Sequence, residues 1–95
     1  MSATNASLFP LGTVVATPGA SAAFDPHPGF LPGILSRHVR GDWGDVGRAD
    51  SRANDDAVRA EARILSAYRT PAGTKLWVIT EADRSSTCVL TPDEY

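Results

Sequence analysis

The hydrophobic pattern divides the chain into a helical first part and a strand-rich last part. Three segments of the last part are rich in β-branched and aromatic side chains, which predicts strands over residues 64–70, 75–80 and 86–90. Pro71-Ala72-Gly73 has the length and the glycine of a hairpin loop between the first two strands. Residues 81–85 separate the second pair, and Pro92 ends the last strand. The pattern therefore predicts an antiparallel meander.

The middle strand of this meander is apolar on both faces. Leu76 and Val78 share one face, and Trp77 and Ile79 share the other. A strand with two apolar faces is typical of the interior of a sheet. We therefore predict that residues 75–80 are paired on both edges and that Trp77 belongs to the core.

The first part of the chain predicts one short strand, at residues 12–16, followed by helices. Thr17-Pro18 is a helix start, because threonine can cap and proline fits the first helical position. Helices are expected over residues 19–24, 31–39 and 51–62, the last one capped by Asp50 or Ser51. The second helix has one face of apolar spacing, formed by Leu31, Ile34, Leu35 and His38. The third is polar, and its candidates for burial are Ala53, Ala57, Val58 and Ala60.

These elements predict an α+β domain. A short N-terminal strand and two to three helices would pack on one face of a three- to four-stranded antiparallel sheet. Residues 8–95 form this single domain, and the small polar residues 1–7 are expected to be a disordered tail.

Composition narrows the functional classes. The chain has 95 residues and a formal charge of −2, which fits one domain and disfavours a dedicated nucleic-acid binder. A single cysteine, Cys88, excludes an intramolecular disulfide and a cysteine-cluster zinc site. No segment is apolar for long enough to span a bilayer, and the N-terminus has no secretory pattern. We therefore expect a soluble cytoplasmic protein that does not bind membranes.

Motifs for cofactors and metals are absent from the sequence. There is no phosphate-binding glycine loop, no dinucleotide fingerprint and no HExxH zinc motif. A metal site would have to use carboxylates, for which the candidates are Asp42, Asp45, Glu81 and Asp83, but their spacing matches no known loop. We therefore expect no cofactor and no metal.

One set of residues has the composition of a catalytic site. A metal-independent endoribonuclease needs a base for the 2′-hydroxyl, an acid for the leaving oxygen and arginines around the phosphate. The matching side chains are His38, Glu81, Arg84 and Arg69. The alternative interpretation is structural: His38 would be half-buried with Asp42 as its partner, and Glu81 and Arg84 would be an exposed pair in a hairpin loop. We favour the structural interpretation.

The glycine-rich loop 40–47 offers the candidate binding surface. If Trp43 is exposed, it can serve as a hot spot for a partner protein, flanked by Arg40, Asp42 and Asp45. The two aspartates would then favour a basic, nucleic-acid-handling partner. If Trp43 is buried, the loop is part of the scaffold. The exposure of Trp43 decides between these two interpretations.

Four segments resemble a known group of proteins: LFPLGTVVATPGA, LSRHVRGDWGD, ILSAYRTPAGTKLWVITEADRSS and the final LTPDEY. From Leu8 to Tyr95 the chain is similar to short bacterial "plasmid-related" proteins encoded on plasmids and other mobile elements. The resemblance carries no catalytic residues over to this chain. It implies an accessory protein that acts on a host defence or replication protein, as anti-CRISPR and anti-restriction factors do.

Taken together, these features predict a non-enzymatic protein that binds and modulates another protein. The alternative is the endoribonuclease described above. A third possibility is a nucleic-acid-binding regulator that uses the basic cluster Arg37-His38-Val39-Arg40, which the acidic net charge disfavours. Oligomeric state and the identity of the partner stay open at this level.

Overall fold

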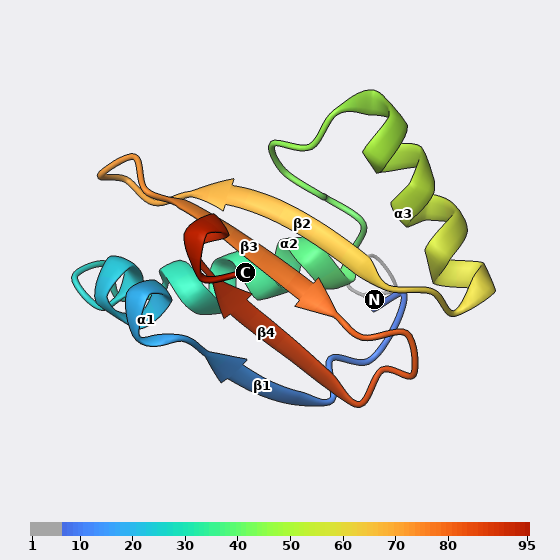
Figure 1. Cartoon of the computed structure of the whole chain (residues 1–95), viewed down its shortest axis with the longest axis horizontal. Helices are drawn as coiled ribbons and strands as arrows, with labels where there is room; N and C mark the ends of the chain where they lie inside the picture. The colour runs from blue at the N-terminus through green and yellow to red at the C-terminus, as the bar shows by residue number, and fades with distance from the viewer. Residues whose placement is uncertain (1–6) are drawn as a thin grey trace, which may run out of the picture.

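A computed structural model describes residues 7–95 and confirms the α+β class (Figure 1). Of the predicted tail at residues 1–7, residues 1–6 lie outside the described residues, and Ser7 is exposed and belongs to no helix or strand. The elements in chain order are β1 (Thr13–Ala16), α1 (Pro18–Phe24), α2 (Phe30–Val39), α3 (Arg48–Ala60), β2 (Ile64–Arg69), β3 (Lys75–Thr80), β4 (Ser86–Leu90) and the 3-10 turn η2 (Pro92–Glu94). No helix in residues 7–95 is long and apolar enough to cross a membrane.

The four strands form one sheet in the order β1-β4-β3-β2. β3 pairs antiparallel with both β2 and β4, which confirms that the strand with two apolar faces is central. β1 runs parallel to β4, so the sheet is mixed and the expectation of a purely antiparallel meander is corrected. Parallel pairing is open to β1 because a long connection through three helices separates it from its partner strand.

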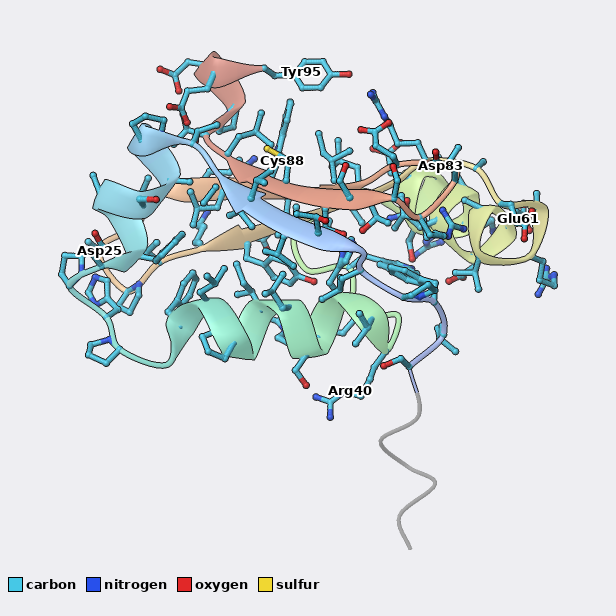
Figure 2. All side chains as sticks on the ribbon, turned by 90° about the horizontal axis from the view of Figure 1, so that it is seen from below. Asp25, Arg40, Glu61, Asp83, Cys88 and Tyr95 are labelled. Atoms are coloured by element: carbon cyan, nitrogen blue, oxygen red, sulfur yellow. The ribbon has the colours of Figure 1, made fainter. Side chains whose placement is uncertain are left out.

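Helix α2 covers one face of the sheet, α1 lies at the end of the sheet where β1 and β4 end, and the C-terminal turn lies on the other face (Figures 1 and 2). The main core lies between these helices and the sheet, where α2 contributes the fully packed Ile34. Its buried members are Ala20, Ile34, Tyr68, Leu76, Val78 and Val89. A second cluster joins the start of the described chain to the loop before α3, to α3 and to β2, through Phe9, Trp43, Ala57 and Ile64.

The assignment of Trp77 to the core is wrong. Trp77 lies on the face opposite the helices and is only half-buried, with its ring edge-on to Tyr95 at a centroid distance of 5.6 Å. Ile79, on the same face, is 4 % exposed. The C-terminal turn therefore covers only part of this second apolar face.

Two of the helix starts show how local chemistry sets the boundaries. Thr17 caps α1 as predicted, because its hydroxyl accepts a hydrogen bond from the Ala20 N–H at 3.2 Å. α3 begins earlier than expected, at Arg48, with Gly47 rather than Asp50 or Ser51 at the cap position. Its buried residues are Asn54 and the predicted Ala57, and the predicted Val58 is partly buried against the second cluster. The predicted Ala53 and Ala60 are exposed.

Candidate functional site

The two edges of the sheet are treated differently by the rest of the chain. β2 forms one edge, and α3 and the loop before it lie alongside that strand (Figure 1). Asn54 of α3 donates from its side-chain amide to the Leu65 carbonyl at 2.8 Å and accepts from the Leu65 N–H at 3.2 Å. One side chain thus satisfies both backbone groups that an additional strand would have used at this position.

The loop between α2 and α3 closes the next position of the same edge. The Ala67 N–H donates to the Trp43 carbonyl at 3.0 Å, and the Asp45 N–H donates to the Ala67 carbonyl at 2.7 Å. Gly44, between them, has a φ of 74°, and a Cβ there would overlap the Ala67 carbonyl oxygen. Only glycine permits this approach without strain, so the loop is fitted to the edge of β2.

The opposite edge, formed by β1, is open. The Thr13 N–H donates to the carbonyl of Ser85, the residue before β4, and the Thr17 N–H donates to the Val89 carbonyl of β4, each at 3.0 Å. Because the backbone alternates along a strand, Val15 also points its N–H to β4, and Val14 and Ala16 point theirs away from the sheet. No other strand of residues 7–95 lies beside β1. The outward N–H and C=O groups of Val14 and Ala16 are therefore available to a further strand.

Apart from its shortness, at four residues, β1 lacks the usual protections of an edge strand. Natural edges carry charged side chains, prolines or bulges that prevent pairing with another chain. Residues 13–16 have no charge, no proline and a regular register with β4. Val14 and Val15 are 39 % and 48 % exposed, so apolar side chains project on both faces beside the free backbone groups.

An apolar groove runs beside this edge, between β1, α2 and the segment before β1. It has a volume of about 790 Å³ and no charged residue in its lining. Figure 2 shows α2 below β1 from the side of the open edge. Most of the lining residues are apolar: Leu8, Phe9, Pro10, Leu11, Val14, Pro32, Leu35 and Val39. A strand added to β1 could place alternate side chains in this groove.

His38, the candidate catalytic base, is a buried structural residue. It is fully inaccessible, and its ring contacts the rings of Phe9 and Trp43 edge-on. Its nitrogens lie 2.5 Å from Ser66 Oγ and 2.9 Å from Thr80 Oγ1, so the expected pairing with Asp42 is wrong. Burial, reinforced by the positive charge of Arg84, lowers the pKa of His38 to about 4.

The hydrogen-bond chain around His38 has a fixed direction. Thr87 Oγ1 donates its only proton to the Leu11 carbonyl at 2.7 Å. Thr80 Oγ1, 2.7 Å from Thr87 Oγ1, must therefore donate to it and accept from His38 Nε2. His38 is then the neutral Nε2–H tautomer, and its Nδ1 accepts from Ser66. Each buried side-chain nitrogen and oxygen atom of this hydrogen-bond network therefore has a hydrogen-bond partner.

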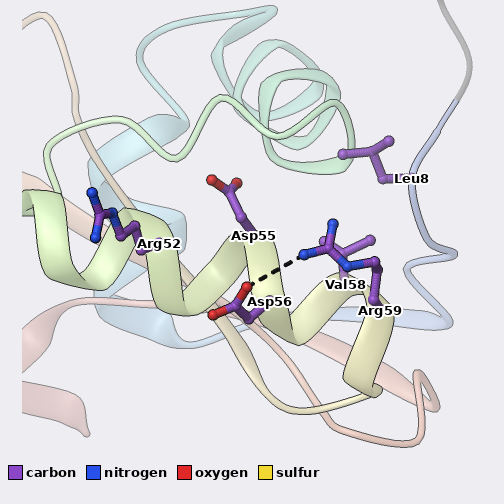
Figure 3. A pocket seen from close by; sticks show the side chains of 6 residues that line it. All are labelled: Leu8, Arg52, Asp55, Asp56, Val58 and Arg59. Atoms are coloured by element: carbon purple, nitrogen blue, oxygen red, sulfur yellow. Dashed lines mark hydrogen bonds and ion pairs between the residues drawn. The ribbon is translucent and has the colours of Figure 1, made fainter.

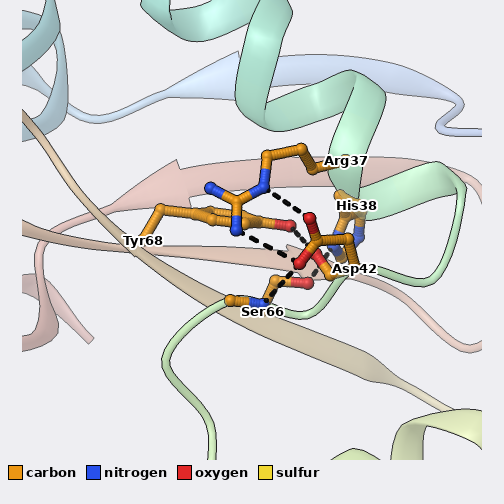
Figure 4. A network of polar contacts seen from close by, with 6 residues as sticks. Arg37, His38, Asp42, Ser66 and Tyr68 are labelled. Atoms are coloured by element: carbon orange, nitrogen blue, oxygen red, sulfur yellow. Dashed lines mark hydrogen bonds and ion pairs between the residues drawn. The ribbon is translucent and has the colours of Figure 1, made fainter.

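The expected binding loop is tied down by side-chain contacts (Figure 4). Arg37 donates to Asp42 through Nε and Nη2, at 2.7 and 3.1 Å, which holds the pKa of Asp42 below its usual range. The Arg37 guanidinium also lies 4.7 Å from the centroid of the Tyr68 ring. Tyr68, whose pKa burial raises to about 12, donates its hydroxyl proton to the Asp42 carbonyl at 2.7 Å.

Of the four residues of the expected binding surface, Trp43 is buried, whereas Arg40, Asp42 and Asp45 are exposed. The hot-spot hypothesis for Trp43 is wrong, because this side chain is 4 % exposed and its Nε1–H donates to Asp55 at 3.0 Å. Asp42 is paired with Arg37, and Asp45 lies 3.6 Å from Arg69. Arg40 is exposed and forms no ion pair with another residue in the described part of the chain.

The alternative catalytic set is not brought together. Arg69 and Glu81 lie at opposite ends of the β2–β3 ladder, and Glu81 pairs with Arg63 at 3.4 Å. Arg84 donates to the Ala57 and Ala62 carbonyls at 2.9 and 2.6 Å, which caps the C-terminal end of α3. Its guanidinium lies 5.3 Å from the Phe9 ring centroid. A phosphate would have to displace these contacts to reach Arg84.

A second hollow, of about 600 Å³, lies between α3 and Leu8 (Figure 3). Its charged lining is mixed: Arg59 pairs with Asp56 at 3.4 Å, and Asp55 accepts the Trp43 hydrogen bond. Within residues 7–95, no three histidine, cysteine or acidic side chains are grouped closely enough to hold a metal ion. The hollow therefore presents no single charge to a ligand.

The residues of the open edge were missed as a site by sequence reasoning. Val14 and Val15 were identified as strand residues, but their exposure depends on which strand lies beside them. The available signal was the short uncharged run Thr13–Ala16 between Gly12 and Pro18.

Comparison with protein-family models, with curated proteins and with solved structures found no match for this chain.

Proposed function

We propose that this chain is a non-catalytic protein-binding module whose binding element is the open edge of β1. An extended segment of another protein would add to the sheet there, with its backbone on Val14 and Ala16. Alternate side chains of the segment would enter the groove between β1 and Leu35 of α2. The observation that carries the proposal is the asymmetry of the sheet. Asn54 and the loop at Gly44 bond the outward backbone groups of β2, and nothing in residues 7–95 does so for β1.

The chemistry of this edge defines the class of partner. Outward N–H and C=O groups are complementary to the backbone of another strand, and each hydrogen bond contributes about 0.5–1.5 kcal/mol. The uncharged groove adds the burial of apolar side chains, at about 25 cal/mol per Å². We therefore expect an extended, uncharged segment with apolar residues at alternate positions, rather than a basic surface.

The test uses random peptides displayed on phage and selected on the full chain. Enriched peptides are expected to show alternating apolar residues. Val14→Ala keeps the outward N–H but trims one wall of the groove, so it should weaken binding by less than Val14→Pro does. Val14→Pro, which removes the outward N–H but no hydrogen bond to β4, should weaken binding at least about tenfold. Near-ultraviolet circular dichroism of the buried Trp43 checks that each variant is folded. Equal binding by Val14→Ala and Val14→Pro would refute the proposal.

Two further hypotheses belong to the same level of proposal. The resemblance to plasmid-related proteins suggests that the partner segment comes from a host defence or replication protein, including a nucleic-acid-handling one. The endoribonuclease is not favoured by any observation at His38, Glu81 or Arg84. An RNA cleavage assay with wild type and His38→Ala tests the endoribonuclease hypothesis, and we expect cleavage by neither protein.

A further inference from the structure

We propose that a second copy of this chain occupies the β1 edge when no partner segment is bound, forming a symmetric pair through antiparallel β1 strands. This inference rests on the proposed function, since it concerns the same edge, and it adds how that edge is protected in the free protein. A second copy is a natural occupant because its own β1 is an extended, uncharged apolar segment.

The outward groups of β1 select one register. In an antiparallel pair, two residues opposite each other exchange both backbone hydrogen bonds at alternate positions. The outward residues are Val14 and Ala16, so a two-fold axis at Val15 places Val14 opposite Ala16 of the partner subunit, and Ala16 opposite Val14 of the partner subunit. Every outward N–H of the strand is then bonded. A register centred on Ala16 would instead place Val14 opposite Pro18 of the partner subunit, which has no N–H to donate. A register centred on Val14 would place Ala16 opposite Gly12 of the partner subunit, whose φ of 66° takes it out of the extended strand.

The side chains agree with this register. Val15 meets Val15 of the partner subunit in a non-hydrogen-bonded pair, where side chains approach most closely. Val15 is 48 % exposed in the single chain, so this pairing covers the most exposed residue of β1 among the large apolar ones. No charged residue lies in Thr13–Ala16 or in the adjoining groove, so two copies meet without like-charge repulsion.

The pairing is small and is expected to be weak. A strand of four residues offers less contact area than a standard interface. An edge held by such a pair can be exchanged for a longer partner segment. Self-pairing and partner binding are therefore mutually exclusive at β1.

The first experiment measures mass and amide exchange of the wild-type chain between about 10 μM and 1 mM. Sedimentation velocity should show the average mass rising from 10.0 kDa toward twice that value. Hydrogen exchange by NMR should show protection of the Val14 and Ala16 amides that increases with concentration. The Thr13 and Thr17 amides, bonded to β4, are the internal control and should be protected at every concentration.

The second experiment is a charge swap at the two-fold axis. Val15→Lys and Val15→Glu should each stay monomeric up to about 1 mM. In a pair of identical variants, the two residues at position 15 would face each other with the same charge. An equimolar mixture should recover the association of wild type. Monomeric wild type throughout the range, unchanged association of Val15→Lys, or failure of the mixture to associate would each overturn the inference. In any of these cases, peptide binding that still depends on the Val14 N–H would leave the proposed function standing. Association of the wild type without any peptide binding would instead support the self-pairing and refute the proposed function.

Discussion

His38 Nε2 donates to Thr80 Oγ1 at 2.9 Å, joining the last turn of α2 to the central strand through a fully buried contact. Neither group can reach water, so the His38 Nε2–H depends on Thr80 for its hydrogen bond, whereas Thr80 also bonds Thr87. Sequence position alone would have allowed a general base here. The closed environment instead makes the imidazole a fixed neutral connector between the two layers of the fold.

The first prediction concerns pH. The pKa of His38 is about 4 in the folded chain and 6.5 in the unfolded chain, so the unfolded state binds the proton first as the pH falls. The stability that neutral His38 provides is complete above about pH 6.5 and is lost progressively toward pH 4, by about 3 kcal/mol in total. Urea unfolding of wild type and His38→Gln between these pH values measures the effect. Glutamine keeps a donor and an acceptor but does not titrate, so an equal pH dependence in both proteins would contradict the prediction.

The second prediction concerns the hydroxyl chain. Thr80→Val keeps the shape of the side chain but removes the acceptor for His38 and the donor to Thr87. The free energy of unfolding should fall by about 1–3 kcal/mol, because a buried N–H is left without a partner. Thr13→Val, at an exposed position of β1, is the matched control and should change stability by less than about 0.5 kcal/mol. Similar free energies of unfolding for the two variants in a urea titration would show that these buried hydrogen bonds contribute little to stability.

The third prediction ranks the two tryptophans. Trp43→Ala should destabilise the chain by about 3–5 kcal/mol, since it empties a buried site and removes the hydrogen bond to Asp55. Trp77→Ala should destabilise it by roughly half as much, because Trp77 is half-buried and packs on Tyr95 at the surface. Far-ultraviolet circular dichroism during urea unfolding provides the measurement without relying on either fluorophore. A larger loss at Trp77 would reverse our assignment of the core.

The fourth prediction compares two glycines. Gly44→Ala should destabilise the chain by more than about 1 kcal/mol, because φ is positive and the new Cβ would meet the Ala67 carbonyl. Gly33→Ala lies inside α2 with open space around it and should stabilise the chain by about 0.4–1 kcal/mol. Thermal unfolding of both variants gives the two signs in one experiment. Stabilisation by Gly44→Ala would show that the loop does not need its close approach to β2.

Much of the fold could be predicted because it depends on local patterns. The two-sided apolar strand 75–80 is central, and Thr17-Pro18 begins a helix, because both signals act within a few residues. The parallel pairing of β1 with β4 could not be predicted in this way, since their paired residues are more than seventy positions apart, as in Thr13 with Ser86.

The site was harder to predict because it depends on which residues become neighbours. The place of His38 on the apolar face of its helix indicated burial, but its partners Ser66 and Thr80 come from two different strands. The available signal was that each of three adjacent strands has one polar residue at a position that faces the core: Ser66, Thr80 and Thr87. For Trp43, no periodicity exists in an irregular loop, so the direction of the side chain was open until the packing of α3 was known.

The closed edge at β2 would limit the proposed self-association to two copies. A sheet with one open edge forms a closed pair, and growth stops there, because the far edge of each copy is already satisfied by Asn54 and the loop at Gly44. If α3 were released, every copy would have two free edges, and strand addition could repeat without limit, as it does in fibres. The amide of Asn54 thus occupies the backbone groups through which a third copy would have to add to the pair.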